Sequence, residues 1–229
     1  MKSFIPSIYR LIKGIENANP GSGRQLAEVV AKHIPEKEEM LPLADFDHPH
    51  NQSYGRTLLY HKNNFCIYLM AWNPGDFTAI HDHGTTEWGC VYAFDDFTHR
   101  LYTLKENLLT LKSDKKFLKS SIARIGSDTV HMMGNMHQKK QNLSLHIYGT
   151  SKPEKGLAQQ SKVYFPELGK TVISDGPAYL HHQQQPIHNT IIQLETEKET
   201  LKDYLELRKE QAKLSGNQYP EILDAYQSS

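Results

Sequence analysis

The chain has 229 residues, a length that suits one domain of sandwich or barrel size with appendages. Lysine plus arginine number 26, as do aspartate plus glutamate, so the charge balance gives no reason to expect nucleic acid or an anionic membrane as a partner. The sequence has no apolar run near the ~18 residues of a membrane span, and its N-terminus lacks the apolar core of a signal peptide. With only Cys66 and Cys90, it has no disulfide framework. We expect a cytoplasmic, enzyme-sized protein that is a monomer or a weak homodimer.

The first part of the sequence has the period of helices. Apolar residues recur at spacings of three and four over residues 4–17, and Asn19-Pro20-Gly21 ends that pattern. A second helix is expected from Leu26 to His33, because Pro35 follows. We expect these elements to form an N-terminal helical segment, residues 1–50, that packs on the rest of the chain.

From Tyr54 onward the pattern is that of strands. β-rich runs alternate with turns, and strands are expected at residues 54–60, 65–72, 78–83, 88–94, 98–103, 107–111, 121–125 and 142–149. Many short strands with frequent turns indicate an all-β sandwich or barrel. Residues 195–214 are rich in charge and predict a helix that stops at Gly216. Four histidines in loops are expected to be solvated: His48, His50, His181 and His182.

The pair His81 and His83 is the strongest chemical signal in the sequence. On a strand, residues two apart point to the same face, so both imidazoles would point the same way. A third histidine from another strand, His131, would complete a site of three nitrogen ligands. Imidazole suits zinc, copper, iron and nickel. Because closed structural metal sites use four protein ligands, a set of three indicates a catalytic metal site rather than a structural one.

The spacing around these histidines resembles the two motifs of the cupin superfamily. The first motif is matched by Gly75, His81, His83 and Glu87. The second is matched by His131 and Asn135, although Gly126 stands where a proline is expected. The resemblance implies a mainly β fold, the cupin double-stranded β-helix or jelly-roll-like barrel, with N-terminal helices and a C-terminal helical extension. We expect a cupin catalytic domain at residues 51–170 and a loop and helical extension at 171–229.

Two further motifs resemble the cysteine dioxygenases, thiol dioxygenases of the cupin superfamily. Tyr54-Gly55-Arg56 looks like their Tyr-x-Arg, and Ser144-Leu145-His146-Ile147-Tyr148 looks like their Ser-x-His-x-Tyr. The distance from His131 to Ser144 also fits that family. The matches cover residues 54–150 and fall in the expected order.

This resemblance implies ferrous iron, Fe²⁺, held by His81, His83 and His131. The partners it implies are a small-molecule thiol, bound as thiolate, and O₂. Both oxygen atoms end on sulfur, so that L-cysteine becomes cysteine sulfinic acid. The implied function is therefore that of an oxidoreductase in cysteine catabolism.

Two groups of polar residues have roles that physical chemistry supports. Tyr54 and Arg56 share a strand face, and a guanidinium is a permanent cation whose fork fits the carboxylate of a substrate. Ser144, His146 and Tyr148 also share a face. A serine–histidine–tyrosine relay would fix the imidazole tautomer and aim the phenol at the site.

The sequence departs from the cysteine dioxygenase pattern at two places. Glu87 fits the general cupin motif as a fourth ligand, but we expect it to turn away because Gly84 can form a turn before the next strand. Some family members link a cysteine covalently to the relay tyrosine. We expect no Cys90–Tyr148 link, because Gly89 resembles the glycine of bacterial members. Cys66 is expected to be a buried strand residue.

The substrate prediction depends on Arg56. Related mercaptopropionate dioxygenases have glutamine there, so arginine favours cysteine over 3-mercaptopropionate. Two alternatives stay open at this point. The alternatives to a thiol dioxygenase are another cupin enzyme, with Glu87 as a fourth ligand, and a metal-binding sensor whose charged C-terminal helix docks a partner.

Overall fold

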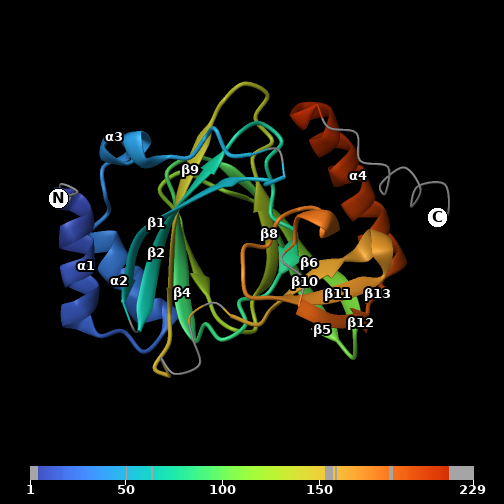
Figure 1. Cartoon of the computed structure of the whole chain (residues 1–229), viewed down its shortest axis with the longest axis horizontal. Coiled ribbons are helices and arrows are strands. Elements are labelled where there is room, and N and C mark those ends of the chain that lie inside the picture. The colour runs from blue at the N-terminus through green and yellow to red at the C-terminus, as the bar shows by residue number, and fades with distance from the viewer. Residues whose placement is uncertain are drawn as a thin grey trace.

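The computed structural model describes residues 5–49, 51–62, 64–152, 157, 159–185 and 188–216, with the backbone alone for 188–191. Helices lie at opposite ends of a β-barrel (Figure 1). The helices of these ranges are α1 Pro6–Ala18, α2 Gly23–Lys32, α3 Lys37–Met40 and α4 Lys198–Ser215. The helices expected near residues 4–17, 26–33 and 195–214 are thus confirmed, each with ends shifted by a few residues.

Two sheets pack face to face and form the barrel. One has the order β1-β2-β9-β4-β7. Its strands are β1 Gly55–Lys62, β2 Phe65–Trp72, β4 Trp88–Ala93, β7 Ile122–Ile125 and β9 Asn142–Gly149. The other has the order β12-β11-β10-β3-β8-β5-β6-β13. Its strands are β3 Ile80–His81, β5 Phe97–Lys105, β6 Leu108–Phe117, β8 Val130–Gly134, β10 Ser161–Phe165, β11 Lys170–Ser174, β12 His188–Gln193 and β13 Glu195–Thr196. The mainly β barrel predicted from the cupin resemblance is confirmed.

The central strands of the five-stranded sheet, β2, β9 and β4, are buried on both faces, and the two faces have different compositions. On β9 the residues Leu143, Leu145 and Ile147 belong to the core beneath the N-terminal helices. The alternating residues Ser144, His146 and Tyr148 are buried on the other face. This period of two is the strand period, and it places a row of polar groups inside the barrel.

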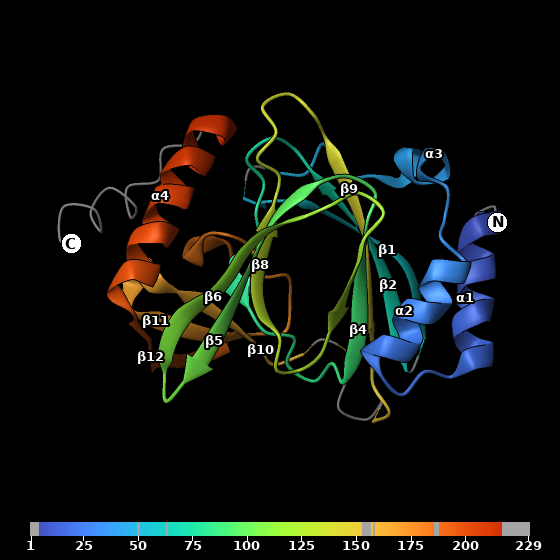
Figure 2. The same ribbon diagram turned by 180° about the vertical axis from the view of Figure 1, so that it is seen from behind.

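The N-terminal helices cover the outer face of this sheet. In α1 the buried residues are Ile8, Leu11, Ile12 and Ile15, a helical stripe that belongs to the same core as the outward residues of β9. Helix α2 begins at the cap Ser22, whose side chain accepts from the backbone N–H of Gln25. Figure 2 shows α1 and α2 beside β1, β2 and β4, with α4 at the opposite end of the barrel.

The C-terminal part adds strands as well as a helix. Residues 171–229 were expected to hold a loop and a helix, and β11, β12 and β13 also lie there, in the eight-stranded sheet. Helix α4 ends at Gly216, which has a φ of 70°, as the sequence predicts. Arg208 of α4 is buried against Glu167 at 3.2 Å and Nδ1 of His181 at 3.1 Å. The prediction of a solvated His181 is therefore wrong, because α4 covers that loop.

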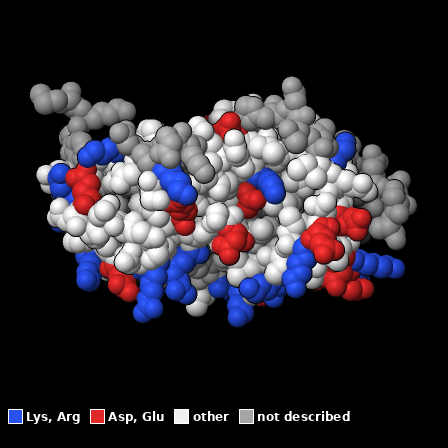
Figure 3. All heavy atoms as spheres, turned by 90° about the horizontal axis from the view of Figure 1, so that it is seen from below, with Lys and Arg blue, Asp and Glu red and all other residues white. Residues whose placement is uncertain are grey.

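The surface carries charges of both signs. On the face drawn in Figure 3, Lys and Arg side chains lie among Asp and Glu side chains, with uncharged surface between them. The expectation that nucleic acid is not a partner rests on the charge balance and stays a prediction. Within the described ranges, no helix combines the length and the apolar character needed to cross a membrane.

Candidate metal centre and substrate cavity

Three histidines converge on the inner face of the eight-stranded sheet. His81 of β3 lies directly opposite His131 of β8 in the antiparallel ladder, and His83 follows two residues after His81. The candidate ligand atoms of the three residues lie within 4.8 Å of one another. Strand β3 ends at His81, so His83 is held by the start of the following turn. The convergence inferred from the sequence is present even though the strand is shorter than predicted.

The ring nitrogens of these histidines fit a metal. Nδ1 of His81 lies 2.9 Å from the carbonyl oxygen of Ala79, and Nδ1 of His131 lies 2.8 Å from Nε2 of His99. Both contacts leave the Nε2 atoms available. Neither ring nitrogen of His83 has a partner of hydrogen-bonding geometry among the described residues, although both are buried. A bound cation would give one of these two nitrogens a partner.

The electrostatics of the group also favour metal binding. Burial lowers the pKa of His81, His83 and His131, and for the last two the neighbouring histidines lower it further. The imidazoles are therefore neutral near neutral pH, and neutral imidazole is the form that binds a metal.

The polar row on β9 forms a chain of hydrogen bonds. Oγ of Ser144 lies 2.9 Å from Nε2 of His146, and Nδ1 of His146 lies 2.9 Å from the hydroxyl of Tyr148. The indole N–H of Trp72 donates to Oγ of Ser144 over 2.9 Å. The tyrosine ring lies beside the candidate ligands, with its centroid 5.6 Å from that of His83.

The contacts of Ser144 assign a direction to this chain, because the indole N–H of Trp72 can only donate and Nε2 of His146 is the acceptor found for the serine hydroxyl among the described residues. Ser144 accepts from Trp72, so its own hydroxyl hydrogen is directed to Nε2 of His146. Burial lowers the pKa of His146 to about 3, so the ring is neutral and carries its single proton on Nδ1. That N–H donates to the oxygen of Tyr148. The phenolic hydrogen of Tyr148 is left free to donate into the cavity.

A small cavity lies between the two sheets, beside the three histidines and Tyr148. It is lined by Tyr54, Arg56, Met70, His81, Asp82, His83, Tyr148, Ser161 and Gly176–Ala178. The metal-ligand candidates come from the eight-stranded sheet, whereas Arg56 and Tyr148 come from the five-stranded sheet. The structure thus brings one or more residues of three separate motifs to one cavity: Tyr54 and Arg56, His81 and His83, and Tyr148.

Arg56 is the cation of this cavity. Its guanidinium carbon lies 3.8 Å from the centre of the Tyr68 ring, and its Nε is buried without a hydrogen-bond partner. The ion pairs found among the described residues do not include Arg56. A permanent cation held in this way is available to an incoming anion.

The opposite wall comes from the C-terminal part of the chain. Ser161 begins β10, and the loop Gly176–Ala178 follows β11. Tyr179 packs on Tyr54 with ring centroids 5.2 Å apart, and the N–H of Ala79 donates to the carbonyl of Ala178. This wall was not part of the sequence prediction, because nothing in its composition marks it as a site.

Glu87 lies away from the three histidines. Its carboxylate accepts hydrogen bonds from the backbone N–H and the hydroxyl of Ser151, and its side chain is exposed. The turn that redirects the chain needs Gly84, which has a φ of 50° and where a Cβ would collide with the carbonyl oxygen of Gln159. The three-histidine group of the described residues does not include Glu87.

The two cysteines have different positions. Cys90 faces the core beneath the N-terminal helices, whereas its neighbour Gly89 lies opposite Tyr148 in the ladder. A Cβ at Gly89 would lie 3.4 Å from the ring of Tyr148, so the position beside that ring is a glycine. Cys66, opposite Tyr148 on the other side, is buried as expected, and burial raises the pKa of its thiol to about 11.

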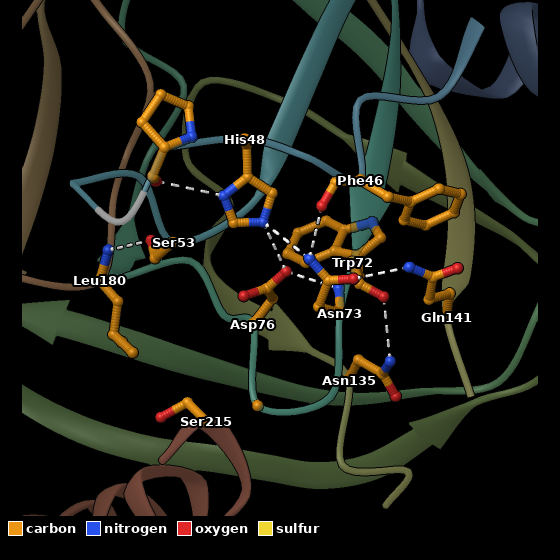
Figure 4. A network of polar contacts seen from close by, with 12 residues as sticks. Phe46, His48, Ser53, Trp72, Asn73, Asp76, Asn135, Gln141, Leu180 and Ser215 are labelled. Carbon is orange, nitrogen blue, oxygen red and sulfur yellow. Dashed lines mark hydrogen bonds and ion pairs between the residues drawn. The ribbon is translucent and has the colours of Figure 1, made fainter. Parts of the chain in front are cut away.

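A polar network holds the turn that leads into β3 (Figure 4). The ring Nε2 of His48 pairs with Asp76 at 2.9 Å, and Asp76 also accepts from the backbone N–H of Asn73. The side-chain amide of Asn135 donates to the carbonyl of Trp72. His48 is therefore a structural residue, and its predicted solvated position is wrong. His50 lies outside the described residues.

The sequence matches the family described as cysteine dioxygenase type I over residues 20–154, which is more than half of the chain. The chain belongs to the cysteine dioxygenase type I family. As a member, it is a dioxygenase-type enzyme of the cupin fold. The match ends before β10, so the C-terminal wall of the cavity lies outside it. No curated protein matches the sequence.

Solved structures with a similar fold are distant. The protein TT1209 of Thermus thermophilus is 14% identical, with a TM-score of 0.39, over 51% of this chain and 95% of its own. A cupin-like protein of Thermotoga maritima is 14% identical, with a TM-score of 0.36, over 48% of this chain and 75% of its own. A sugar phosphate isomerase from a cupin superfamily of Silicibacter pomeroyi is 13% identical, with a TM-score of 0.39, over 60% and 82% of the two chains.

Besides the C-terminal wall of the cavity, sequence reasoning missed Trp72 and His99, which contact the candidate site of this cysteine dioxygenase family member. The indole N–H of Trp72 donates to the hydroxyl of Ser144, and nothing in the sequence of its strand indicated that contact. His99 lies on β5 and contacts His131. The only signal for His99 was a histidine in a strand with the period of two, which does not distinguish a ligand's neighbour from an ordinary core histidine.

Proposed function

We propose that this protein is an iron-dependent thiol dioxygenase that converts L-cysteine and O₂ to cysteine sulfinic acid. The observation that carries the substrate assignment is the guanidinium of Arg56. It lines the same cavity as His81, His83 and Tyr148, and it has no ion-pair partner among the described residues. A short thiol with a carboxylate is the kind of molecule that can meet both the cation and a metal in one small cavity.

His81, His83 and His131 would hold the metal through three neutral nitrogens, a ligand set that suits iron. When bound, ferrous iron supplies the positive charge that favours the thiolate form of the substrate and the redox chemistry toward O₂. Three protein ligands leave positions for both reactants. The reaction adds both oxygen atoms to sulfur, so a thiol plus O₂ gives a sulfinic acid with no further reductant.

The protein's own residues orient the substrate. Arg56 would bind its carboxylate through two parallel N–H bonds, with the guanidinium plane held by Tyr68. The relay from Trp72 to Tyr148 keeps the phenolic hydrogen directed into the cavity. There it would donate to the substrate's carboxylate or to the reacting oxygen. Ser144 and His146 act through the tyrosine and are positioning residues.

Oxygen uptake by iron-loaded protein tests the proposal. The protein would be loaded anaerobically, mixed with L-cysteine or with 3-mercaptopropionate in parallel, and the product identified by mass. We expect uptake with L-cysteine and a product that carries two added oxygens. A clear preference for 3-mercaptopropionate would keep the reaction and overturn the substrate. No uptake with either thiol by metal-loaded protein would overturn the dioxygenase proposal.

A further inference from the structure

We propose that His99 is a positioning residue for the metal centre and that it accepts a hydrogen bond from the metal ligand His131. This rests on the metal site proposed above and adds to it a residue that the cysteine dioxygenase motifs do not contain. His99 comes from β5, and it lies behind His131 rather than in the lining of the cavity. Nε2 of His99 lies 2.8 Å from Nδ1 of His131.

The geometry makes the two rings a rigid pair. Their planes are nearly perpendicular, at 88°, so the Nε2 atom of His99 meets the edge of the His131 ring. Phe117 of β6 packs on the His99 ring with centroids 5.6 Å apart, which holds that ring from another side. The strands are fixed as well, because β5 pairs with β8 over Thr98–Tyr102.

A metal on Nε2 of His131 decides the roles of the four nitrogens. The metallated ring must carry its proton on Nδ1, and the acceptor found within reach of that N–H among the described residues is Nε2 of His99. His99 in turn must carry its own proton on Nδ1. In the opposite arrangement His99 would donate to His131, whose proton would then sit on Nε2 and block the metal. A metal on Nε2 of His131 therefore makes His99 the acceptor in this contact.

The other ligands do not share this arrangement. His81 contacts the carbonyl oxygen of Ala79 in its own strand region, an acceptor that no side-chain substitution removes. His83 has no partner of hydrogen-bonding geometry among the described residues. Among the hydrogen-bond partners found for the three ligands, His99 is thus the one that a side-chain substitution can remove. Loss of such a partner typically costs about 10- to 100-fold in metal affinity.

The test compares His99→Leu, which keeps the apolar contact with Phe117, with His99→Gln, whose side-chain oxygen can still accept. His61→Leu, at an exposed position of β1, is the matched control. The anaerobic Fe²⁺ dissociation constant and the rate of iron loss to a chelator are measured on the full chain, together with the thermal midpoint of the metal-free proteins. We expect a Kd about 10- to 100-fold higher for His99→Leu, substantial recovery in His99→Gln, and no change in the control.

Equal iron affinity in His99→Leu and the wild type would overturn this inference alone. So would a Gln variant as weak as the Leu variant, since the ring would then only fill space. Nitrogen NMR of the Zn²⁺-loaded wild type gives a second test that needs no variant. We expect the proton of His99 on Nδ1, and a proton on its Nε2 would overturn the inference. A wild type that binds neither metal would overturn the proposed metal site together with this inference.

Discussion

Replacing Arg56 by glutamine tests how the cavity recognises its substrate. The substitution removes the cation while leaving a polar side chain of similar reach. A hydrogen bond to a charged group is worth about 1.5–3 kcal/mol, and glutamine can retain part of one of the two bonds. We therefore expect a loss of about 2–4 kcal/mol in kcat/KM for L-cysteine, which is roughly 30- to 700-fold.

The Arg56→Gln substitution should lower the stability of the fold much less than it lowers activity. Arg56 makes none of the ion pairs found in the described chain, and the substitution removes mainly its contact over Tyr68. Such a contact is worth about 0.5–1 kcal/mol at exposed sites. A small drop in the thermal midpoint is expected, and Arg56→Lys, which keeps the charge without the fork, should fall between the wild type and the glutamine variant.

Cysteamine, a thiol without a carboxylate, makes this prediction refutable. The assay is oxygen uptake by iron-loaded protein at several concentrations of L-cysteine and of cysteamine. If Arg56 binds the carboxylate, the glutamine variant loses activity with L-cysteine while its slow cysteamine reaction is unchanged. An equal loss with both thiols would show that Arg56 acts on the metal or the fold, and the carboxylate role would be wrong.

Four further outcomes are expected. His83→Ala should retain almost no iron by elemental analysis while its metal-free form unfolds near the wild-type temperature, because the ring has no hydrogen bond of good geometry to lose; normal iron content would exclude it as a ligand. Tyr148→Phe should lower kcat about 100-fold without changing iron affinity, and an unchanged kcat would remove the phenol from the reaction. Peptide mass analysis should find the Tyr148 and Cys90 peptides unlinked, since a covalent link would remove two hydrogens. Cys90→Ser should keep the wild-type activity. Burial opposes the charge of Asp95, but hydrogen bonds from Lys140 and Lys37 lower its pKa. Asp95→Asn should therefore cost about 1–3 kcal/mol of stability at neutral pH. That contribution is present above the unfolded pKa of about 3.9 and is lost as pH falls through the lower folded value, so urea unfolding should show the two proteins converging below about pH 4.

The sequence could predict those parts of the site that depend on the strand period. Ser144, His146 and Tyr148 alternate with apolar residues on β9, and the structure joins them by hydrogen bonds. The turn of Glu87 away from the histidines also followed from Gly84, because a glycine after the ligand pair permits a conformation that other residues avoid. Local chemistry decides both features, so a local pattern was enough.

The features that the sequence missed depend on contacts between distant segments. His48 and His181 stand in polar stretches typical of loops, yet each is buried because another segment packs over it, the turn at Asp76 in one case and α4 in the other. The wall at Gly176–Ala178 reaches the cavity through the bridge between Thr78 and Tyr179. Nothing in these short sequences encodes the partner, so only the folded chain reveals them.

Because the cavity is formed by two sheets, substitutions can alter metal binding and substrate turnover separately. His81, His131 and His99 lie on β3, β8 and β5, and His83 lies in the turn after β3. The placement of the candidate ligands depends on the ladder that pairs His81 with His131. Arg56 and Tyr148 lie on β1 and β9 of the other sheet. Substitutions on the first sheet should act on metal affinity, and those on the second should act on kcat and KM with the metal retained. Residues from different sheets that share no direct contact should therefore have additive effects, whereas His99 and His131, which are in contact, should not.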